Sequence, residues 1–489
     1  MEIPYLNKTY MFWFELFFLA VLVFAFRLYV TVPVESSGDS FVKWYEAKRL
    51  AHGLDYSRLD HHTMRWGINF LSLLFQKIFG TQASTYYLPS AFAATLSAVF
   101  IFLIGTQIQD RVLGIMALLL FCFHPSIIVA GSQLFPGIFS CCYILGSVYF
   151  LLLYTSSKHS NLGYLVASAI FLFCAYGAKM TNLFFLPALV GYLYWSCRRL
   201  RPVFLYLGIL GLGLMVETLI IDTLLGDYTM YGRFALAGGH LNIMKNGLEG
   251  EKSPWGIITR WQMLPNYTYL PAITGLFSAF YFVDNRSAYH REYCLALCFL
   301  SFAFFLSFGV VSLKPVRFLL PHMPRYTNVI IPLSLLLILI GVGKMRQYRY
   351  LVIVFLLFAF SFAKPFNDLL YSPLHRQFYK IDKFQQEVND YLDKGYAYIF
   401  FNIKKARLYR ALFVNDRVSM GLDGAEPAKI YIVPPGKTRF NPNRTIYILT
   451  LKQNNVIAGI VRPYPHEYRL SVEHFTSGDL RISQNWELF

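Results

Sequence analysis

A series of about eleven apolar runs, each near the length that a helix needs to cross a bilayer, fills the sequence from residue 11 to residue 363. Hydrophobic residues make up 56% of the 489 residues and charged residues only 15%, well below the charged fraction of soluble proteins. The pattern predicts a mainly α-helical, polytopic transmembrane bundle. The expected spans lie near 11–32, 85–107, 111–130, 134–154, 161–178, 181–197, 203–223, 266–283, 293–313, 327–343 and 348–363.

One further apolar stretch, Trp66 to Phe79, is too short to span and is interpreted as a re-entrant or interfacial helix. Short basic loops between the spans favour a cytoplasmic N-terminus, because cytoplasmic loops are enriched in Lys and Arg. An odd number of spans then puts the C-terminal part of the chain on the outer face. The sequence therefore predicts a transmembrane domain, 1–363, whose outer-face loops are 33–84, 224–265 and 314–326.

The tail, residues 364–489, differs in its sequence pattern from the preceding apolar spans. Its first part, 374–394, has apolar residues at helical spacing. Short β-like runs follow, separated by Gly, Pro and Asn turns, at 396–401, 429–434 and 445–451. These patterns predict a small α+β extramembrane domain on the outer face.

The charge balance narrows the class of partner. Lys and Arg number 44 against 27 Asp and Glu, a formal net charge of +17. No nucleic-acid-binding motif accompanies this excess, so membrane lipid headgroups or phosphates are the expected partners and nucleic acid is not. The predicted outer loops are also basic, against the orientation rule, which favours phosphate binding. No nucleotide-binding glycine motif, metalloprotease motif or metal-ligand cysteine spacing is present.

An acid stands directly after the first span. Asp39 lies within Gly38-Asp39-Ser40, before an amphipathic stretch that ends at Gly53. Acidic residues at membrane boundaries are costly and usually functional. Asp39 could deprotonate an acceptor or hold a divalent cation. The alternative is that it caps the helix that follows.

Further polar residues crowd the predicted outer loops. His61, His62 and Arg65 precede Trp66, and Lys179 joins two spans. An arginine or lysine there could bind a phosphate, and a histidine could move a proton, contact an acceptor or ligate a metal. The alternative for these side chains is interfacial anchoring and snorkelling.

The seventh span and the last outer loop add two more groups. Glu217 lies deep in an apolar run, where an acid needs a partner or a water-filled cavity, and Arg233 follows it. The loop before the tenth span is the densest cationic patch between spans and is a candidate phosphate clamp; the alternative is a headgroup-binding patch. Its candidate residues are Lys314, Arg317, His322, Arg325 and Tyr326.

Three segments resemble the GT-C glycosyltransferases, the superfamily of protein O-mannosyltransferases and of the aminoarabinose transferase for lipid A. They are GDSFVKWYEAKRLAHGLDY (38–56), VETLIIDTLLGDYTMYGRF (216–234) and PHMPRYTNVIIPLSLLL (321–337). The resemblance implies transfer of a sugar, hexosyl or pentosyl, from a polyprenyl-phosphate donor to a lipid, glycan or protein acceptor. It implies inversion at the sugar and a site on the outer or luminal face.

Residue roles follow from the same resemblance. Asp39 would be the general base or an acid that orients the acceptor, and basic residues among Lys179, Arg317 and Arg325 would hold the leaving phosphate. Many members place a second acid after the third span, where this chain has Gly137. Either one acid suffices or Glu217 substitutes, and a divalent cation stays open as a cofactor.

Membership would place the protein in a bacterial inner membrane, with its site on the periplasmic side. The alternative is a eukaryotic protein of the endoplasmic reticulum, with its site on the luminal side. A transporter or flippase of lipid-linked sugars is the first rival, and it would favour inverted repeats, which the sequence does not display. A non-catalytic membrane scaffold is the second, and it would leave Asp39 and the cationic loop 314–326 unexplained.

Overall fold

The computed structural model describes residues 8–31, 38–56, 63–157, 161–226, 233, 261–262, 264–308, 310–313, 316–318, 327–344 and 348–370, together with short strands between 396 and 488. The chain divides into two compact units. The first comprises Met1–Val30, Arg58–Ile68 and Ser90–Leu369. The second comprises Thr31–Ser57, Asn69–Pro89 and Leu370–Phe489.

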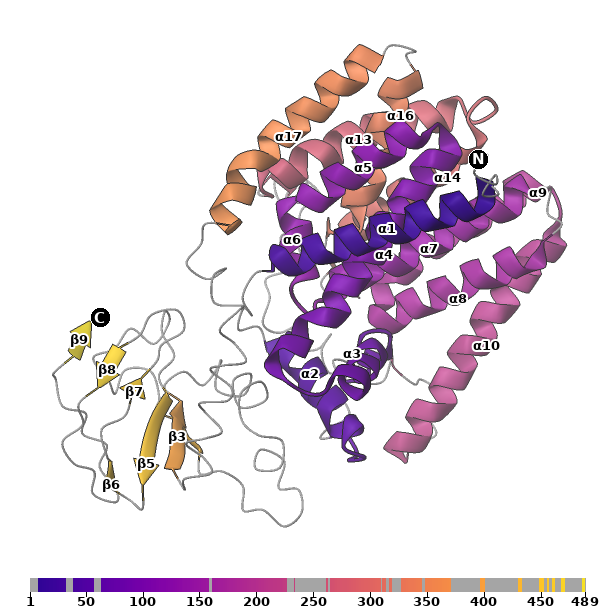
Figure 1. Cartoon of the computed structure of the whole chain (residues 1–489). Coiled ribbons are helices and arrows are strands. Elements are labelled where there is room, and N and C mark those ends of the chain that lie inside the picture. Colours follow the sequence, from indigo (N-terminus) through magenta and orange to yellow (C-terminus); the bar gives the residue numbers. More distant parts are fainter. Residues whose placement is uncertain are drawn as a thin grey trace, which may run out of the picture. The chain divides into compact units, whose positions relative to one another are not determined.

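The first unit is a helical bundle (Figure 1). Each predicted span overlaps a helix or two consecutive helices; the span predicted at 293–313 was too long, because α14 ends at Phe308 and residues 310–313 form strand β1. The helices are α1 (Lys8–Tyr29), α4 (Leu88–Ile108), α5 (Arg111–Phe123), α6 (Pro125–Gly131), α7 (Pro136–Ser156), α8 (Leu162–Ala178), α9 (Leu186–Cys197), α10 (Leu200–Leu225), α13 (Asn266–Asp284), α14 (His290–Phe308), α16 (Ile330–Lys344) and α17 (Tyr348–Leu370). Short 3₁₀ helices, η1 (Ala83–Tyr87) and η2 (Met180–Phe185), lead into α4 and α9.

Not every one of these helices is long enough to cross a bilayer alone. Among the described residues, six helices are sufficiently long and apolar, and a seventh span results if the bent pair α5 and α6 is counted as one. Helices α8 and α16 are apolar but shorter. The mainly helical, multi-span architecture is therefore confirmed, whereas the number of about eleven spans stays a prediction.

The bend between α5 and α6 measures 70° and has a local cause. Pro125 is the first residue of α6, so the chain lacks an amide hydrogen there and the residue before it, His124, takes an extended conformation. The buried His124 ring donates from Nε2 to the carbonyl oxygen of Tyr267, 2.8 Å away. This bond ties the broken helix to the start of α13.

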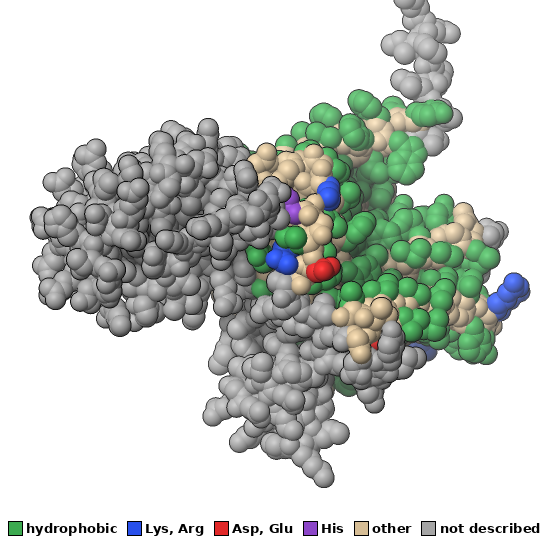
Figure 2. All heavy atoms as spheres, turned by 90° about the horizontal axis from the view of Figure 1, so that it is seen from below, with side chains coloured by type: hydrophobic (Ala, Val, Ile, Leu, Met, Phe, Trp, Pro, Cys, Tyr) green, Lys and Arg blue, Asp and Glu red, His purple; other side chains and the backbone are tan. Residues whose placement is uncertain are grey.

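The outside of the bundle is apolar. Large side chains point outward from helices far apart in the sequence, with exposed fractions of 70% for Phe14, 72% for Phe277 and 75% for Phe360. Figure 2 shows hydrophobic side chains over most of the described surface seen from below. Such a surface suits lipid rather than water. The protein is an integral multi-pass membrane protein.

The second unit contains two short helices, α2 (Gly38–Ala51) and most of α3 (Trp66–Phe79). Helix α3 covers the same residues as the apolar stretch singled out in the sequence. It contacts α2 through two bonds to backbone oxygens: Gln76 donates to Trp44 over 3.3 Å, and Lys77 donates to Ala51 over 2.5 Å. The helix predicted at 66–79 is thus confirmed, and its placement in the membrane interface stays a prediction.

The strands are short. In the first unit, β1 (Val310–Leu313) pairs antiparallel with β2 (Val316–Phe318). In the tail, strands order as β4-β3-β5-β6 and as β7-β8-β9. The β-like runs predicted from the sequence contain β3 (Tyr396–Phe400), β4 (Ile430–Ile432) and most of β5 (Ile448–Lys452). The remaining tail strands are β6 (Asn455–Val456), β7 (Ile460–Val461), β8 (Tyr468–Leu470) and β9 (Trp486–Leu488). The helix predicted at 374–394 lies outside the described residues, so the α+β domain stays a prediction.

Candidate functional site

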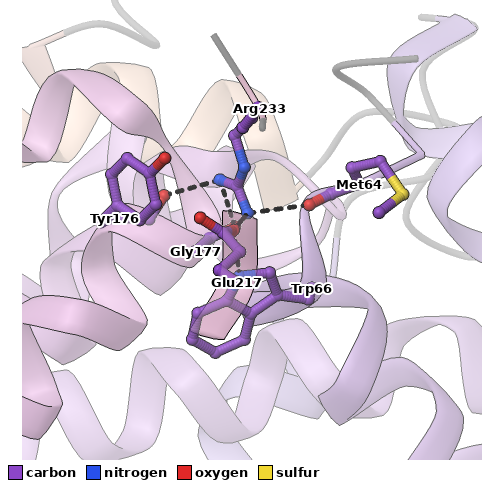
Figure 3. A network of polar contacts seen from close by, with 6 residues as sticks. All are labelled: Met64, Trp66, Tyr176, Gly177, Glu217 and Arg233. Atoms are coloured by element: carbon purple, nitrogen blue, oxygen red, sulfur yellow. Dashed lines mark hydrogen bonds and ion pairs between the residues drawn. The ribbon is translucent and has the colours of Figure 1, made fainter. Parts of the chain in front are cut away.

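A buried arginine caps the C-terminal end of α8. The last carbonyl groups of a helix have no partner within the helix and carry the negative end of its dipole. Arg233 meets two of them, donating from Nη1 to the carbonyl oxygens of Tyr176 and Gly177 over 2.8 and 3.2 Å. Its guanidinium carbon also lies 4.8 Å from the centroid of the Tyr176 ring. The cation is thereby bound to the end of α8 (Figure 3).

The same guanidinium is paired with a carboxylate. Nη2 of Arg233 donates to Oε1 of Glu217 and, over 2.9 Å, to the carbonyl oxygen of Met64. Arg233 is only 2% exposed and Glu217 only 6%. Burial lowers the pKa of Arg233, and the Glu217 carboxylate acts in the opposite direction. The ion pair neutralises two charges that would be costly to bury singly.

Trp66, the first residue of α3, completes the cluster. Its indole Nε1 donates to the same Oε1 atom of Glu217 over 2.6 Å. Figure 3 shows the indole and the guanidinium reaching this carboxylate from different elements. The ring also packs on Phe173 of α8, with centroids 4.9 Å apart. Glu217 therefore connects α10, the start of α3 and the residue that caps α8.

Two glycines allow α3 and α8 to approach each other at this point. A Cβ atom on Gly67 would lie 2.6 Å from the backbone nitrogen of Ala178, and one on Gly177 would lie 2.5 Å from the indole of Trp66. Tyr143 of α7 fixes the same place by donating to the carbonyl oxygen of Gly67 over 2.7 Å. The backbones meet because neither glycine has a side chain.

We expect alanine at either glycine to destabilise the fold. Gly67→Ala and Gly177→Ala each force backbone or a large ring to move, which costs about 1–3 kcal/mol in packed sites. Gly208→Ala on α10 is the matched control, because nothing lies within 4 Å of a Cβ there. That control should be neutral or stabilising by up to about 1 kcal/mol. Melting temperatures of the three purified variants check this, and equal shifts would contradict the close approach.

The crossing brings the chain positions of two predicted cations close together. Arg65 directly precedes Trp66, and Lys179 directly follows Ala178, so each lies within two residues of the contact between Gly67 and the end of α8. Both side chains are half-buried and therefore reachable from solvent. The predicted phosphate ligands Arg65 and Lys179 thus flank a buried centre whose own charges cancel.

The other candidates are placed only in part. Asp39 lies in the first turn of α2, in the second unit, and its side chain is outside the described residues, as is that of Arg317 in β2. Six further candidates lie wholly outside the described residues: His61, His62, Lys314, His322, Arg325 and Tyr326. Their roles stay predictions.

The structure shows new contacts for two of the candidates, Arg233 and Glu217. Arg233 stays a predicted phosphate ligand, although its guanidinium donates to four protein oxygens and only Nε has no acceptor among the described residues. Glu217 was expected to need a partner or a water-filled cavity, and its Oε1 atom accepts two hydrogen bonds in a buried position. Within the described part of the chain, no three His, Cys, Asp or Glu side chains gather where they could hold a metal ion.

Sequence reasoning missed the role of Trp66, which it treated as an interfacial anchor. It also gave no sign that backbone carbonyls of Met64, Tyr176 and Gly177 would bind Arg233. The available signal was an acid buried in a span with an arginine beyond the end of that span, because such an acid needs a cationic partner.

Comparison with known proteins supports the resemblance seen in the motifs. Residues 66–221 match the sequence family described as dolichyl-phosphate-mannose-protein mannosyltransferase. The matched segment contains Trp66, Gly177, Lys179 and Glu217. The match confirms the resemblance to GT-C glycosyltransferases. Among curated proteins, no sequence matches the chain.

Solved structures with similar backbones are distant in sequence. ArnT from Cupriavidus metallidurans in the apo state is 12% identical, with a TM-score of 0.49, over 82% of this chain and 72% of that one. The oligosaccharyltransferase of Archaeoglobus fulgidus, in complex with Zn and sulfate, is 11% identical, with a TM-score of 0.45, over 77% of this chain. The present chain covers only 55% of that enzyme's length.

Proposed function

We propose that this protein is an integral-membrane glycosyltransferase. It takes a sugar from a polyprenyl-phosphate donor and transfers it to a lipid, glycan or protein acceptor on the outer or luminal face, with inversion at the sugar. The observation that carries the proposal is the contact of Gly67 with the end of α8, which brings the chain positions of Arg65 and Lys179 beside the buried Glu217–Arg233 pair. Lys179 and Glu217 of this arrangement lie in the segment that matches the mannosyltransferase family.

The chemistry needs cations that are already in place. When the bond from sugar to phosphate breaks, negative charge develops on the leaving phosphate oxygen. Fixed donors aimed at that charge lower the barrier more than mobile ones, because they need not reorganise during the reaction. Arginine can bind a phosphate through two parallel N–H groups, and lysine acts as a compact point charge. Arg65 and Lys179 supply one of each.

In this proposal the buried cluster of Glu217, Arg233 and Trp66 holds the segments that carry Arg65 and Lys179 in place. Arg233 binds Met64, which directly precedes Arg65, and also Gly177, two residues before Lys179. Glu217 neutralises Arg233 and accepts a bond from Trp66, which directly follows Arg65. Glu217 and Arg233 are thus positioning residues in this proposal. A role for Glu217 as the second acid is the alternative, and it predicts a different outcome in the variants discussed below.

The acceptor is activated separately. Inverting transfer needs a base that removes the proton of the acceptor hydroxyl or amine as the new bond forms. Asp39 is proposed for this step on the strength of the family resemblance at residues 38–56. It could also hold a divalent cation, which the resemblance leaves open.

We expect Arg65→Ala and Lys179→Ala to weaken the use of the donor. Each removes one charge near the leaving phosphate, and loss of a preorganised donor of this kind typically lowers turnover by about 10²–10³-fold. The measurement is the kinetics of transfer from a polyprenyl-phosphate sugar by the purified protein. Arg111→Ala is the matched control, because Arg111 is an exposed cation paired with Glu15 on another part of the bundle.

The outcome separates the two functional classes. Loss of transfer in both variants, with normal kinetics in Arg111→Ala, supports the proposed phosphate site. Wild-type kinetics in both variants would exclude Arg65 and Lys179 from that site. Donor binding without transfer to any acceptor, in the wild type as well, would favour a transporter or a scaffold instead.

A further inference from the structure

The arginine turn, formed by the junction of α9 with α10 and the first residues of α10, carries three arginines in four residues: Arg198, Arg199 and Arg201. All three side chains are exposed. Exposed His290 opens α14 beside this turn, and α14 packs against α9. The acid in the first turn of α14, Glu292, is buried and bridged to Lys344 over 2.9 Å. Glu292 is therefore already paired with Lys344, and the three exposed arginines form a concentrated positive charge.

Arg198 holds an unusual backbone conformation. With φ of 53° and ψ of 23°, it is left-handed, and among the described residues no other non-glycine residue has a positive φ. Its amide donates to the carbonyl oxygen of Tyr194 over 2.8 Å and so closes the end of α9. Glycine is the usual residue at such a position, because a side chain strains the backbone there. An arginine that persists under this strain points to a role for its side chain.

An aromatic platform lies next to Arg198. The Trp195 ring packs against His290 at a tilt of 37°, with centroids 4.7 Å apart, and makes an edge contact with Tyr293 at 4.8 Å. The guanidinium carbon of Arg198 is 6.0 Å from the Trp195 ring centroid. Tryptophan with adjacent cations is typical of the headgroup depth of a membrane, where one side of the ring is apolar and the other wet.

The position of the turn separates it from the candidate donor site. Arg201 and Glu217 lie on the same helix, α10, which is continuous from Leu200 to Leu225. Sixteen residues of helix correspond to about 24 Å, most of the thickness of a hydrocarbon core. The arginine turn therefore lies toward the opposite membrane surface from the Glu217–Arg233 pair.

We propose that this turn is a binding site for the headgroup of an anionic phospholipid. The phosphate bridges the exposed arginines, and the Trp195 platform contacts the upper part of the lipid. Juxtamembrane arginines attract anionic lipid headgroups in this way, each contributing about fivefold in affinity. The donor lipid of the proposed function is not required for this interaction.

The test uses the full-length protein purified in detergent. Binding of short-chain phosphatidylglycerol is measured by native mass spectrometry, with phosphatidylcholine of the same chain length and inorganic phosphate as comparison ligands. Arg198→Gly should weaken phosphatidylglycerol binding about fivefold. Because glycine relieves the left-handed strain, the melting temperature should stay unchanged or rise, so weaker binding cannot be ascribed to unfolding. Arg111→Gln, which removes an exposed cation elsewhere, should bind as the wild type does.

A triple variant extends the test. Arg198→Gly with Arg199→Gln and Arg201→Gln should lower phosphatidylglycerol affinity by about a hundredfold. Unchanged binding in the triple variant, or equal binding of phosphatidylcholine by the wild type, would overturn the proposal. Displacement of the lipid by inorganic phosphate at equal concentration would also overturn it, because the site would then recognise free phosphate rather than a lipid headgroup.

Discussion

Replacement of Asp39 by asparagine is expected to lower sugar transfer by about 10²–10⁴-fold, the usual contribution of a general base. Asparagine has the shape of aspartate but cannot accept the acceptor's proton. It also caps helices as well as aspartate does, so this variant removes the base and leaves any capping role at the start of α2 intact. The measurement is transfer from radiolabelled polyprenyl-phosphate sugars by the purified protein, with and without a chelator.

A matched control lies nearby in the sequence. Asp55 is an exposed acid shortly after α2, and Asp55→Asn should transfer sugar at the wild-type rate. Turnover of Asp39→Asn at the wild-type rate would remove Asp39 from the mechanism. Loss of wild-type activity on chelation would assign a divalent cation to the reaction, and transfer that persists with a chelator would assign Asp39 to proton removal alone.

The second large effect is expected at the buried ion pair. Glu217→Ala should destabilise the protein by about 3–5 kcal/mol, because it leaves the Arg233 cation buried without its carboxylate. Arg233→Met should cost a similar amount for the converse reason. The double variant Glu217→Gln with Arg233→Met should cost clearly less than either single change, since no unpaired charge remains and the amide can still accept from Trp66. Denaturation of the purified variants gives these free energies.

The single variant Glu217→Gln separates the two roles of Glu217, because it leaves Arg233 in place. If Glu217 only positions its neighbours, this variant should fold and retain transfer within about tenfold of the wild type, since the amide oxygen can still accept from Trp66 and Arg233. A Glu217→Gln protein that folds but transfers no sugar would make Glu217 the second acid. Equal destabilisation in the single and double variants would contradict the ion pair itself.

Part of this architecture could be predicted from local sequence patterns. The apolar runs correspond to the helices of the bundle, and the helix at 66–79 was predicted with its observed bounds. Such predictions succeed because the length and apolarity of a segment decide whether it can lie in lipid as a helix. The 70° bend after α5 has a local signal as well, Pro125, although its size depends on the packing of His124 against Tyr267.

The candidate site, like the fold, could be predicted only in part from the sequence. The sequence alone identified Glu217, Arg233, Arg65 and Lys179 as separate candidates, because charged groups near or within apolar runs need a reason to be there. It could not show that Arg233 binds Glu217, since the arginine lies 16 residues further along the chain, beyond the end of the helix that carries the acid.

Membrane residence and helical composition were therefore determined by the sequence itself, because they depend on the transfer of local segments from water to lipid. The approach of the segments that carry Arg65 and Lys179 was decided only by tertiary structure. It depends on two glycines, Gly67 and Gly177, that let α3 and α8 touch. Nothing local to either glycine specifies which helix it will meet, because that contact is set by the packing of the whole bundle.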